Sequence, residues 1–336
     1  MAHPYRIREI AQQAGLSEAT VDRVLHDRPG VRASTAAEVR QAISDLDRQR
    51  HQIRLSGQTF LVDLVMQAPQ RFSSAVRAAL ESELPVLRPA SVRARFHLRE
   101  EGSPEEVVGV LDRLGKRGSD GILLKAPDHP AVVDAVARLA DAGVPTVTLV
   151  TDLPRSPRIG YVGIDNRAAG ATAAYLVART GGTGPVLIAL SSTSFRGEEE
   201  REIGFRTVLR QLAPNRRVVE VTNTDGLDAS TLHAVARMLD KEPAVDAVYS
   251  IGGGNLAIVE AFRQAGRTPA IFIAHDLDDD NRTLLRRRQL TAVLHHDLRT
   301  DAVTACRMIM AARGALPTPR WSGGSAIQVI TPYNEP

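Results

Sequence analysis

The sequence contains little cysteine and few aromatic residues. Cys306 is the single cysteine among 336 residues, so the chain cannot form an internal disulfide or a cysteine-rich zinc site. Phe, Trp and Tyr together make up 4% of the sequence, and Trp321 is the one tryptophan. Such a low aromatic content argues against a binding pocket built mainly on stacked aromatic rings.

Long hydrophobic runs and a large excess of one charge are also missing. No apolar stretch approaches the roughly 20 residues that a membrane-spanning helix needs, and the polar start of the chain does not resemble a secretory signal. We therefore predict a cytoplasmic protein with no membrane partner. Lys and Arg (42) nearly balance Asp and Glu (39), and 43% of the residues are hydrophobic, which excludes general disorder. Two or three domains are expected at this length.

The first 50 residues contain three helical patterns and no strand pattern. A first helix with one apolar face ends at Gly15, whose missing Cβ suits a tight turn. Ser17 is a natural N-cap for a second helix, which the Asp-Arg-Pro-Gly run at 27–30 interrupts. A third helix starts near Ser34 or Thr35 and carries its last apolar residue at Leu46. We predict that the polar residues 47–58 form a connector.

The first two helices have the proportions of a helix-turn-helix motif. In that motif the second helix enters the major groove of DNA, and residues in its first turns reach the base edges. Arg23 suits bidentate contact with guanine, while Ser17 and Thr20 can reach phosphate oxygens. Glu18 and Asp22 either accept hydrogen bonds from a cytosine amine or form exposed ion pairs with Arg23. A helical hairpin that packs on the rest of the chain and never meets DNA is the alternative.

From Phe60 onward, short apolar strands alternate with amphipathic helices. The strand patterns lie near residues 60–66, 92–98, 121–124, 146–150, 159–162, 185–190, 217–221, 247–251, 270–274 and 290–294. This alternation predicts parallel sheets covered by helices on both faces. The strands are too many for one simple doubly wound unit, so we predict an α/β fold with two sheets of five or six strands, divided near residues 163–165.

Residues 7–26, with the sequence IREIAQQAGLSEATVDRVLH, resemble the N-terminal headpiece of LacI/GalR repressors, whose pattern is A-x-x-A-G-V-S-x-x-T-V-S-R-V-L-N. The alternating remainder is similar to the regulatory domain of that family, which itself resembles periplasmic sugar-binding proteins. The resemblance implies an all-α headpiece at 1–50, a connector at 51–58 and a two-lobed effector domain at 59–336. Lobe 1 would comprise about 59–163 and 297–322, and lobe 2 about 164–294 and 323–336.

Two features depart from the family pattern. Asp22 stands where the family usually has Ser, which affects the operator sequence that would be read. The connector lacks the family's Y-x-P-N-x-x-A-x-x-L hinge helix, so either Leu55 acts as an apolar wedge in the minor groove, or nearby arginines follow the phosphates. The residues that we predict to contact DNA are Ser17, Glu18, Ala19, Thr20, Asp22, Arg23, His26, Arg28 and Leu55.

The resemblance also implies an effector cleft between the two sheets, at the carboxyl ends of their strands. Arg201, in an R-x-x-G-F pattern, and Asp276, at a strand end, match the arginine and the acidic residue with which the family holds its ligand. A planar guanidinium can bind vicinal hydroxyls or a carboxylate through paired hydrogen bonds. The other candidates are polar groups that follow strands and apolar walls, namely Asp152, Asn255, Phe72 and Phe195. Each of these six residues has the alternative role of a loop cap or a surface contact.

These features together predict a transcriptional regulator and not an enzyme. We expect a repressor that binds double-stranded operator DNA as a homodimer, responds to a small sugar, polyol or sugar acid, and needs no cofactor. Because His295 and His296 are adjacent on an extended segment and point to opposite faces, we predict no metal site. The acidic runs at 198–200 and 278–280 are expected to mark the starts of solvated helices.

Two other functions remain as alternatives. Gly252-x-Gly254-x-x-Ala257 follows a strand and Asp276 ends the next one, which is the fingerprint of an NAD-dependent dehydrogenase. Such fingerprints usually open the first βαβ unit, whereas this one lies deep in the chain. A sugar-binding transport receptor is the other alternative, and it would need a signal peptide and no headpiece.

Overall fold

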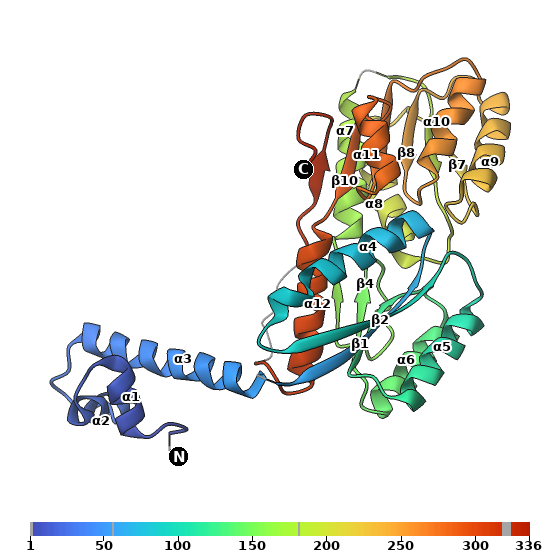
Figure 1. The fold of residues 1–336 in the computed structure, drawn as a ribbon. Helices are drawn as coiled ribbons and strands as arrows, with labels where there is room; N and C mark the ends of the chain where they lie inside the picture. Colours follow the sequence, from blue (N-terminus) through green and yellow to red (C-terminus); the bar gives the residue numbers. More distant parts are fainter. Residues whose placement is uncertain (1–2, 56, 181, 318–323) are drawn as a thin grey trace. The chain divides into compact units, whose positions relative to one another are not determined.

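The computed structural model describes residues 3–55, 57–180, 182–317 and 324–336, which fall into two compact units. The first unit consists of the chain up to Thr59 together with Leu87–Ser91, and the second comprises the rest. Helices α1 (Ile7–Ala14), α2 (Glu18–Leu25) and α3 (Ala33–Leu55) build the first unit, drawn in blue in Figure 1. None of the helices in the described ranges is long and apolar enough to cross a membrane.

Local sequence signals determine the start and end of α1 and α2. Gly15 closes α1 in the left-handed conformation, with φ of 67°. Ser17 caps α2, since its hydroxyl oxygen accepts a hydrogen bond from the backbone N–H of Thr20 at 3.2 Å. The three helices enclose a small apolar core made of Tyr5, Ile10, Ala11, Val21, Val39 and Ala42.

Helix α3 is longer than the sequence pattern predicts. The polar pattern of residues 47–58 leaves open whether this connector is helical, and the helix continues to Leu55. Residues 47–55 contain no glycine or proline, and the Arg and Gln that dominate them are good helix formers. The side chain of Leu55 and the whole of Trp321 lie outside the described residues.

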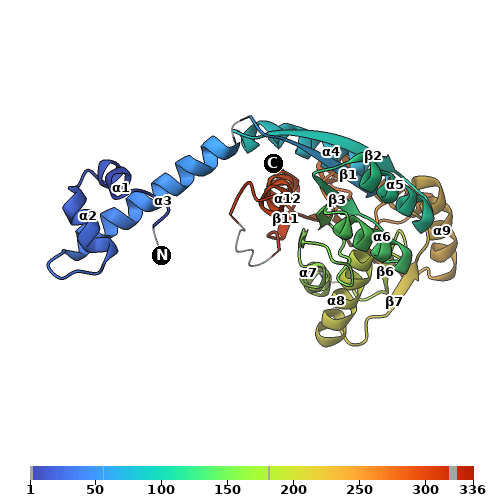
Figure 2. The same ribbon diagram turned by 90° about the horizontal axis from the view of Figure 1, so that it is seen from below.

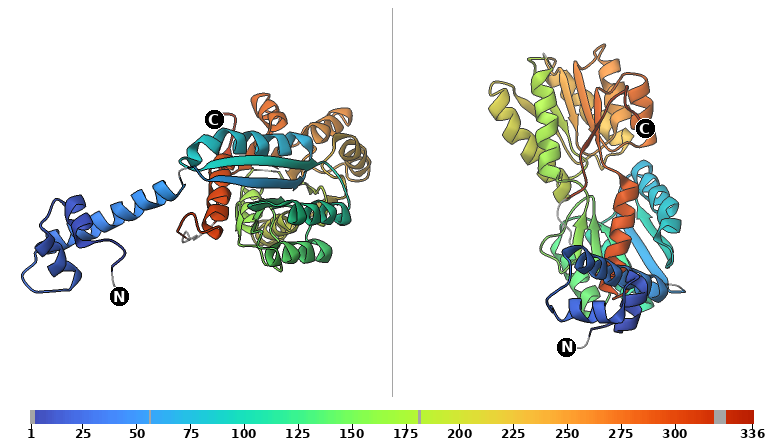
Figure 3. Two further views of the ribbon diagram at one scale, coloured as in Figure 1. Left: turned by 60° about the horizontal axis from the view of Figure 1, so that its bottom comes forward. Right: turned by 90° about the vertical axis from the view of Figure 1, so that its left-hand side faces the viewer.

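The second unit contains two sheets, seen one above the other in the right-hand view of Figure 3. The first has the strand order β2-β1-β3-β4-β5. Its strands are β1 (Thr59–Gln67), β2 (Ser91–Arg99), β3 (Gly121–Lys125), β4 (Thr146–Leu149) and β5 (Gly160–Val162). Its helices are α4 (Gln70–Glu83), the 3₁₀ turn η1 (Leu84–Leu87), α5 (Pro104–Arg117), α6 (Pro130–Asp141) and α12 (Leu298–Ala312). Helices α5 and α6 lie side by side, and α4 packs against α12 (Figures 1 and 2).

The second sheet has the order β11-β10-β9-β8-β6-β7 and is parallel except for β11, which runs antiparallel to β10. Its strands are β6 (Val186–Ala189), β7 (Val218–Val221), β8 (Ala247–Ser250), β9 (Ile271–His275), β10 (Ala292–His295) and β11 (Gln328–Ile330). Its helices are α7 (Asn166–Arg179), α8 (Arg196–Leu212), α9 (Asp228–Lys241), α10 (Asn255–Gln264) and α11 (Asp279–Arg286).

The predicted fold class is confirmed. Strands β1 to β10 fall within a few residues of the predicted ones, and they form the expected two sheets. Strand β11, Gln328–Ile330, was not predicted from the sequence. It follows a crossover in which Ser325 forms a parallel bridge with Ile164, so the first and last crossings between the sheets lie side by side.

Candidate functional site

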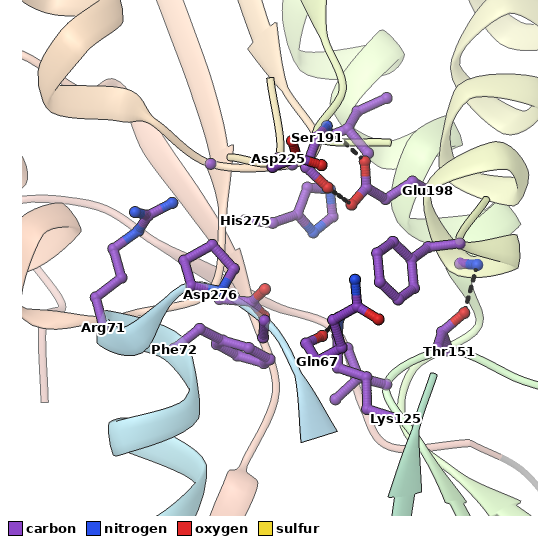
Figure 4. A pocket seen from close by; sticks show the side chains of 18 of the residues that line it. Gln67, Arg71, Phe72, Lys125, Thr151, Ser191, Glu198, Asp225, His275 and Asp276 are labelled. Atoms are coloured by element: carbon purple, nitrogen blue, oxygen red, sulfur yellow. Dashed lines mark hydrogen bonds between the residues drawn. The ribbon is translucent and has the colours of Figure 1, made fainter. Parts of the chain in front are cut away.

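A cavity of about 770 Å³, counting the part open to solvent, lies where the carboxyl ends of the strands of the two sheets face each other. Figure 4 shows the side chains around it. The first sheet contributes residues at the ends of β1, β3 and β4, namely Gln67, Lys125, Val150 and Thr151. The second sheet contributes residues that follow β6, β7, β8 and β9, namely Ser191, Asp225, Gly252, Gly253, Asp276 and Asp278.

The structure brings four of the six predicted effector residues to this cavity. Phe72 on α4 and Phe195 just before α8 form apolar walls, while Arg201 on α8 and Asp276 after β9 supply charge. The two charged residues come from different elements that are far apart in the sequence. Whether these four residues contact a ligand stays a prediction.

Asp152 and Asn255 do not line the cavity. The chain turns sharply after β4 at Val150, which has a φ of 65°. Thr151 therefore faces the cavity, and Asp152 pairs with Arg158 instead. The amide of Asn255 donates to the side-chain oxygen of Asn281 at 2.7 Å, and glycines earlier in its loop take the place at the wall. The prediction failed at both positions because a strand end can be read from sequence, but the turn that follows it cannot.

Arg201 and Asp276 each keep one polar atom unsatisfied. The Nε of Arg201 donates to Asn166 Oδ1 at 2.7 Å, whereas its Nη2 is buried without a partner among the described residues. The Oδ1 of Asp276 is likewise buried and unpartnered in the described structure, and it lies 3.7 Å from the Nε2 of His296. Leaving such a group unsatisfied costs about 1–3 kcal/mol, so a ligand that supplied the missing partners would gain affinity.

Glu198 is a cavity residue that the sequence did not reveal. It was expected only to start a solvated helix in the acidic run 198–200, yet its carboxylate accepts a hydrogen bond from the backbone N–H of Ser191 at 2.8 Å and another from the Ser191 hydroxyl. Desolvation raises the pKa of Glu198. The acidic run alone cannot show which of its three members turns toward the cavity.

Asp278 was missed in the same way. It belongs to the acidic run 278–280, but its side chain is 6% exposed and caps α11 by accepting from the backbone N–H of Asn281 at 2.8 Å. Burial raises the pKa of Asp278 to about 6. At pH 8 the carboxylate is therefore charged.

Lys125 is the third missed residue. Its ammonium donates to the carbonyl oxygen of Gln67 at 2.8 Å and lies 4.0 Å from the centre of the Phe195 ring. Desolvation lowers the pKa of Lys125 to about 8. A usable signal existed in the sequence, because Lys125 is one of three lysines and directly follows the buried strand 121–124.

The lowered pKa of Lys125 predicts a pH-dependent contribution to stability. Because the unfolded chain holds this proton up to a pH near 10.5, the unfolded state binds more protons than the folded state between pH 8 and 10.5. The stability of the wild type should therefore rise with pH in that window, by up to about 3 kcal/mol. Lys125→Met has no buried ammonium and therefore lacks this rise. We expect it to have a larger free energy of unfolding than the wild type at pH 7, and this difference should shrink at pH 10. Urea denaturation at both pH values measures the difference.

Lys116→Met is the matched control for this prediction. Lys116 lies exposed on α5, and its substitution should change stability equally at pH 7 and pH 10. If Lys125→Met behaves like Lys116→Met, the Lys125 ammonium is not desolvated in the folded protein.

The histidines near the cavity have separate partners. His275 lies buried with Nε2 2.8 Å from the hydroxyl of Tyr249, and burial lowers the pKa of His275 well below its ordinary value. His295 accepts from the backbone N–H of Leu277 at 3.2 Å, and His296 pairs with Asp301. Within the described ranges, no group of three His, Cys, Asp or Glu residues is arranged to hold a metal ion.

In the first unit, most of the residues predicted to contact DNA lie on α2 or within three residues of its ends, whereas Leu55 ends α3. Val21 points into the core, while Arg23 is exposed and forms no ion pair with any described residue. The other candidates with described side chains are exposed or half-buried, namely Ser17, Glu18, Ala19, Thr20, Asp22, His26 and Arg28. Asp22 pairs with His26 and with Arg28, at 3.1 Å each, rather than with Arg23. The guanidinium of Arg23 is thus available to another partner.

Two family descriptions match the chain. Residues 72–315 match "Periplasmic binding protein domain", and residues 6–49 match "Bacterial regulatory proteins, lacI family". Among solved structures, the glucose-galactose binding protein GanP of Geobacillus stearothermophilus shares the fold, with a TM-score of 0.73 and 21% identity. That similarity covers 83% of this chain and 99% of GanP.

Curated relatives include two regulators from Streptomyces. The "HTH-type transcriptional regulator reg1" of Streptomyces lividans is 31% identical over 223 residues, which cover 63% of this chain and 61% of reg1. The "HTH-type transcriptional regulator MalR" of Streptomyces coelicolor is 29% identical over 263 residues, which cover 75% of this chain and 67% of MalR. The match thus spans about three fifths to two thirds of the length of these relatives. The chain belongs to the periplasmic binding protein domain family over its larger part, residues 72–315, and its residues 6–49 form a domain of the lacI family of bacterial regulatory proteins.

Proposed function

We propose that this protein is a sequence-specific DNA-binding transcriptional regulator, a repressor whose hold on its operator is controlled by a small effector in the cavity. The observation that carries the proposal is the exposed guanidinium of Arg23, which has no ion-pair partner among the described residues, on α2 of a lacI-family headpiece. A guanidinium in that position can read guanine in the major groove. The two Streptomyces relatives, described as transcriptional regulators, support this function.

The polar groups around the cavity favour an effector rich in hydroxyls. Arg201 offers an unsatisfied donor and Asp276 an unsatisfied acceptor, and a hydroxyl group can serve both. The charged side chains at the wall include more acids than bases, namely Glu100, Glu198, Asp225, Asp276 and Asp278 against Arg71, Lys125 and Arg201. Within the class of sugars, polyols and sugar acids, we therefore favour a neutral sugar or polyol.

The proposed regulator acts in the cytoplasm as a homodimer and has no catalytic activity. Two headpieces related by a two-fold axis would bind half-sites about one helical turn apart on a roughly palindromic operator. We retain 1–50 as the headpiece, 51–58 as the segment that leads into the effector domain, and the two lobes as given above. Helix α3 continues to Leu55, which supports a segment that begins as a continuation of the headpiece's third helix.

The glycines of the dinucleotide fingerprint have a packing explanation. A Cβ at Gly252 would collide with the backbone of Ser191, and a Cβ at Gly254 would collide with the side chain of Thr231. Close approach of neighbouring segments therefore accounts for both glycines without a nucleotide, which favours the regulator over the dehydrogenase.

Asp276→Ala is expected to weaken effector binding about 10–150-fold, because it removes a charged hydrogen-bond acceptor worth about 1.5–3 kcal/mol. The effector is first identified by a thermal-shift screen of the wild type over neutral sugars, polyols, sugar acids and NAD. Calorimetric titration of that compound then gives both affinities. Asp279→Ala, which removes an exposed carboxylate three residues further on, should bind like the wild type.

Two outcomes would contradict this proposal. Equal affinity of Asp276→Ala and the wild type would remove Asp276 from the effector site. A saturable thermal shift with NAD alone would favour the dehydrogenase.

A further inference from the structure

One side chain of the first lobe reaches across the cavity to the second lobe. Arg71 is the second residue of α4, and its Nη2 donates to the carbonyl oxygen of Gly226 at 2.7 Å. Its Nε lies 3.2 Å from the Oδ2 of Asp278. Gly226 belongs to the loop after β7, and Asp278 to the loop after β9. A single guanidinium thus holds two separate loops of the opposite lobe.

The second lobe surrounds the Arg71 guanidinium with a buried carboxylate and a glycine. The Arg71 side chain is 18% exposed and that of Asp278 is 6% exposed, so water screens their attraction less than it would on an open surface. Asp278 is itself fixed, because its Oδ1 caps α11. Gly253 stands beside the guanidinium with a φ of 95°, and a Cβ at that position would collide with the Nη2 of Arg71. The second lobe therefore provides both a counter-charge and the space for this contact.

The chain first passes from one lobe to the other near residues 163–165, and Arg71 lies on the far side of the cavity from this crossing. Figure 4 places Arg71 and Thr151 at opposite edges of the cavity. Thr151 lies close to that crossing, because the neighbouring Val150 accepts a hydrogen bond from Asn166 at 3.2 Å. A contact far from a crossing opposes a hinge motion about that crossing more effectively than a contact close to it. Hinge motion between two lobes is a common way for such clefts to admit a ligand.

We propose that Arg71 is a clasp that holds the two lobes closed around the cavity, and that its release from Gly226 and Asp278 opens the cleft for exchange of the effector. The clasp rests on the proposed role of the cavity as an effector site. Its test, however, needs neither effector nor DNA. Arg71 acts here by positioning the lobes, and it need not touch the ligand.

The distance between the lobes can be measured with two spin labels and double electron–electron resonance. Cys306 is buried, so labels attach selectively to cysteines introduced by Lys116→Cys on α5 and Gln264→Cys on α10, both exposed positions. Labelled full-length protein without ligand at pH 8 should give one main distance. Adding Arg71→Ala should produce a longer and broader distribution. Asp278→Asn, which keeps a capping side chain, should shift the distribution in the same direction by less.

Two further variants separate the clasp from its alternatives. Arg77→Ala is the control on the same helix, because Arg77 pairs with Glu81 of its own helix at 3.0 Å, and it should leave the distance unchanged. Gly253→Ala places a methyl group against the Nη2 of Arg71 and strains a backbone with a φ of 95°, so it should also lengthen the distance. This variant also provides a second test of the clasp if Arg71→Ala does not fold.

An unchanged distance in both Arg71→Ala and Gly253→Ala would overturn the clasp and leave Arg71 as a wall of the cavity. Because no duplex is present in the experiment, this outcome would not touch the proposed DNA binding. Conversely, a protein that binds no DNA could still show the clasp.

Discussion

Gly170→Ala should lower the free energy of unfolding by about 3 kcal/mol. This is the largest stability effect that we expect from a substitution that only adds a methyl group. Gly170 lies on α7 where that helix meets α8. A Cβ at this position would collide with the carbonyl oxygen of Arg201 and lie 2.9 Å from the backbone N of Phe205. Backbone atoms cannot rotate aside as a flexible side chain can, so the two helices must separate. Overpacking of this kind typically costs 1–3 kcal/mol and sometimes more.

The same contact supports the effector site. Gly204 of α8 meets α7 reciprocally, because a Cβ there would collide with the carbonyl oxygen of Arg167. Arg201 and Glu198, which line the cavity, are carried by α8. Separation of α7 from α8 should therefore weaken effector binding in addition to stability.

Gly109→Ala provides the matched control for the stability change. Gly109 lies within α5, and a Cβ there would meet only the Nη1 of Arg113, at 3.5 Å. Since alanine is the better helix former by about 1 kcal/mol, this variant should be as stable as the wild type or more so. Urea denaturation followed by circular dichroism compares the two. Equal stability of Gly170→Ala and Gly109→Ala would mean that α7 and α8 are not in backbone contact.

Arg23→Ala should weaken operator binding by roughly 5–150-fold, which corresponds to the 1–3 kcal/mol that a good bidentate contact contributes. Arg23 is exposed on α2 and has no ion-pair partner among the described residues, so its loss should leave the headpiece folded. Affinity for unrelated duplexes should fall much less, because phosphate contacts carry most of that binding. Fluorescence anisotropy with operator and with scrambled duplex measures both.

Arg113→Ala is the control for the change in net charge. It removes one exposed arginine from α5 in the second unit and should not alter the ratio of operator to scrambled affinity. If Arg23→Ala retains the wild-type ratio, another residue of α2 reads the operator.

Fold and headpiece could be predicted because their signals are local. Short apolar runs between amphipathic helices indicate parallel sheets wherever they occur, and the capping by Ser17 and the turn at Gly15 are encoded within a few residues. The length of α3 was missed because a polar stretch without glycine or proline fits either a helix or a connector.

The effector site could be predicted only in part, for a related reason. Arg201 and Asp276, which the family pattern suggested, line the cavity, and their contact with a ligand stays a prediction. Asp152 was misplaced by one residue, because the left-handed turn at Val150 rotates Thr151 into the cavity. Glu198 and Asp278 each sit in a run of three acids, one within α8 and one at the start of α11, and only the packing of that helix selects the member that faces inward.

Selection of bound duplexes from a random DNA library by the purified wild-type protein is the most direct test of DNA recognition by α2. The selected sequence is then titrated by fluorescence anisotropy at several salt concentrations. We predict an inverted repeat with half-sites about one helical turn apart, and an affinity whose logarithm falls linearly with the logarithm of the salt concentration. Failure to enrich any sequence, together with no salt-sensitive binding to any duplex, would contradict the proposed regulator.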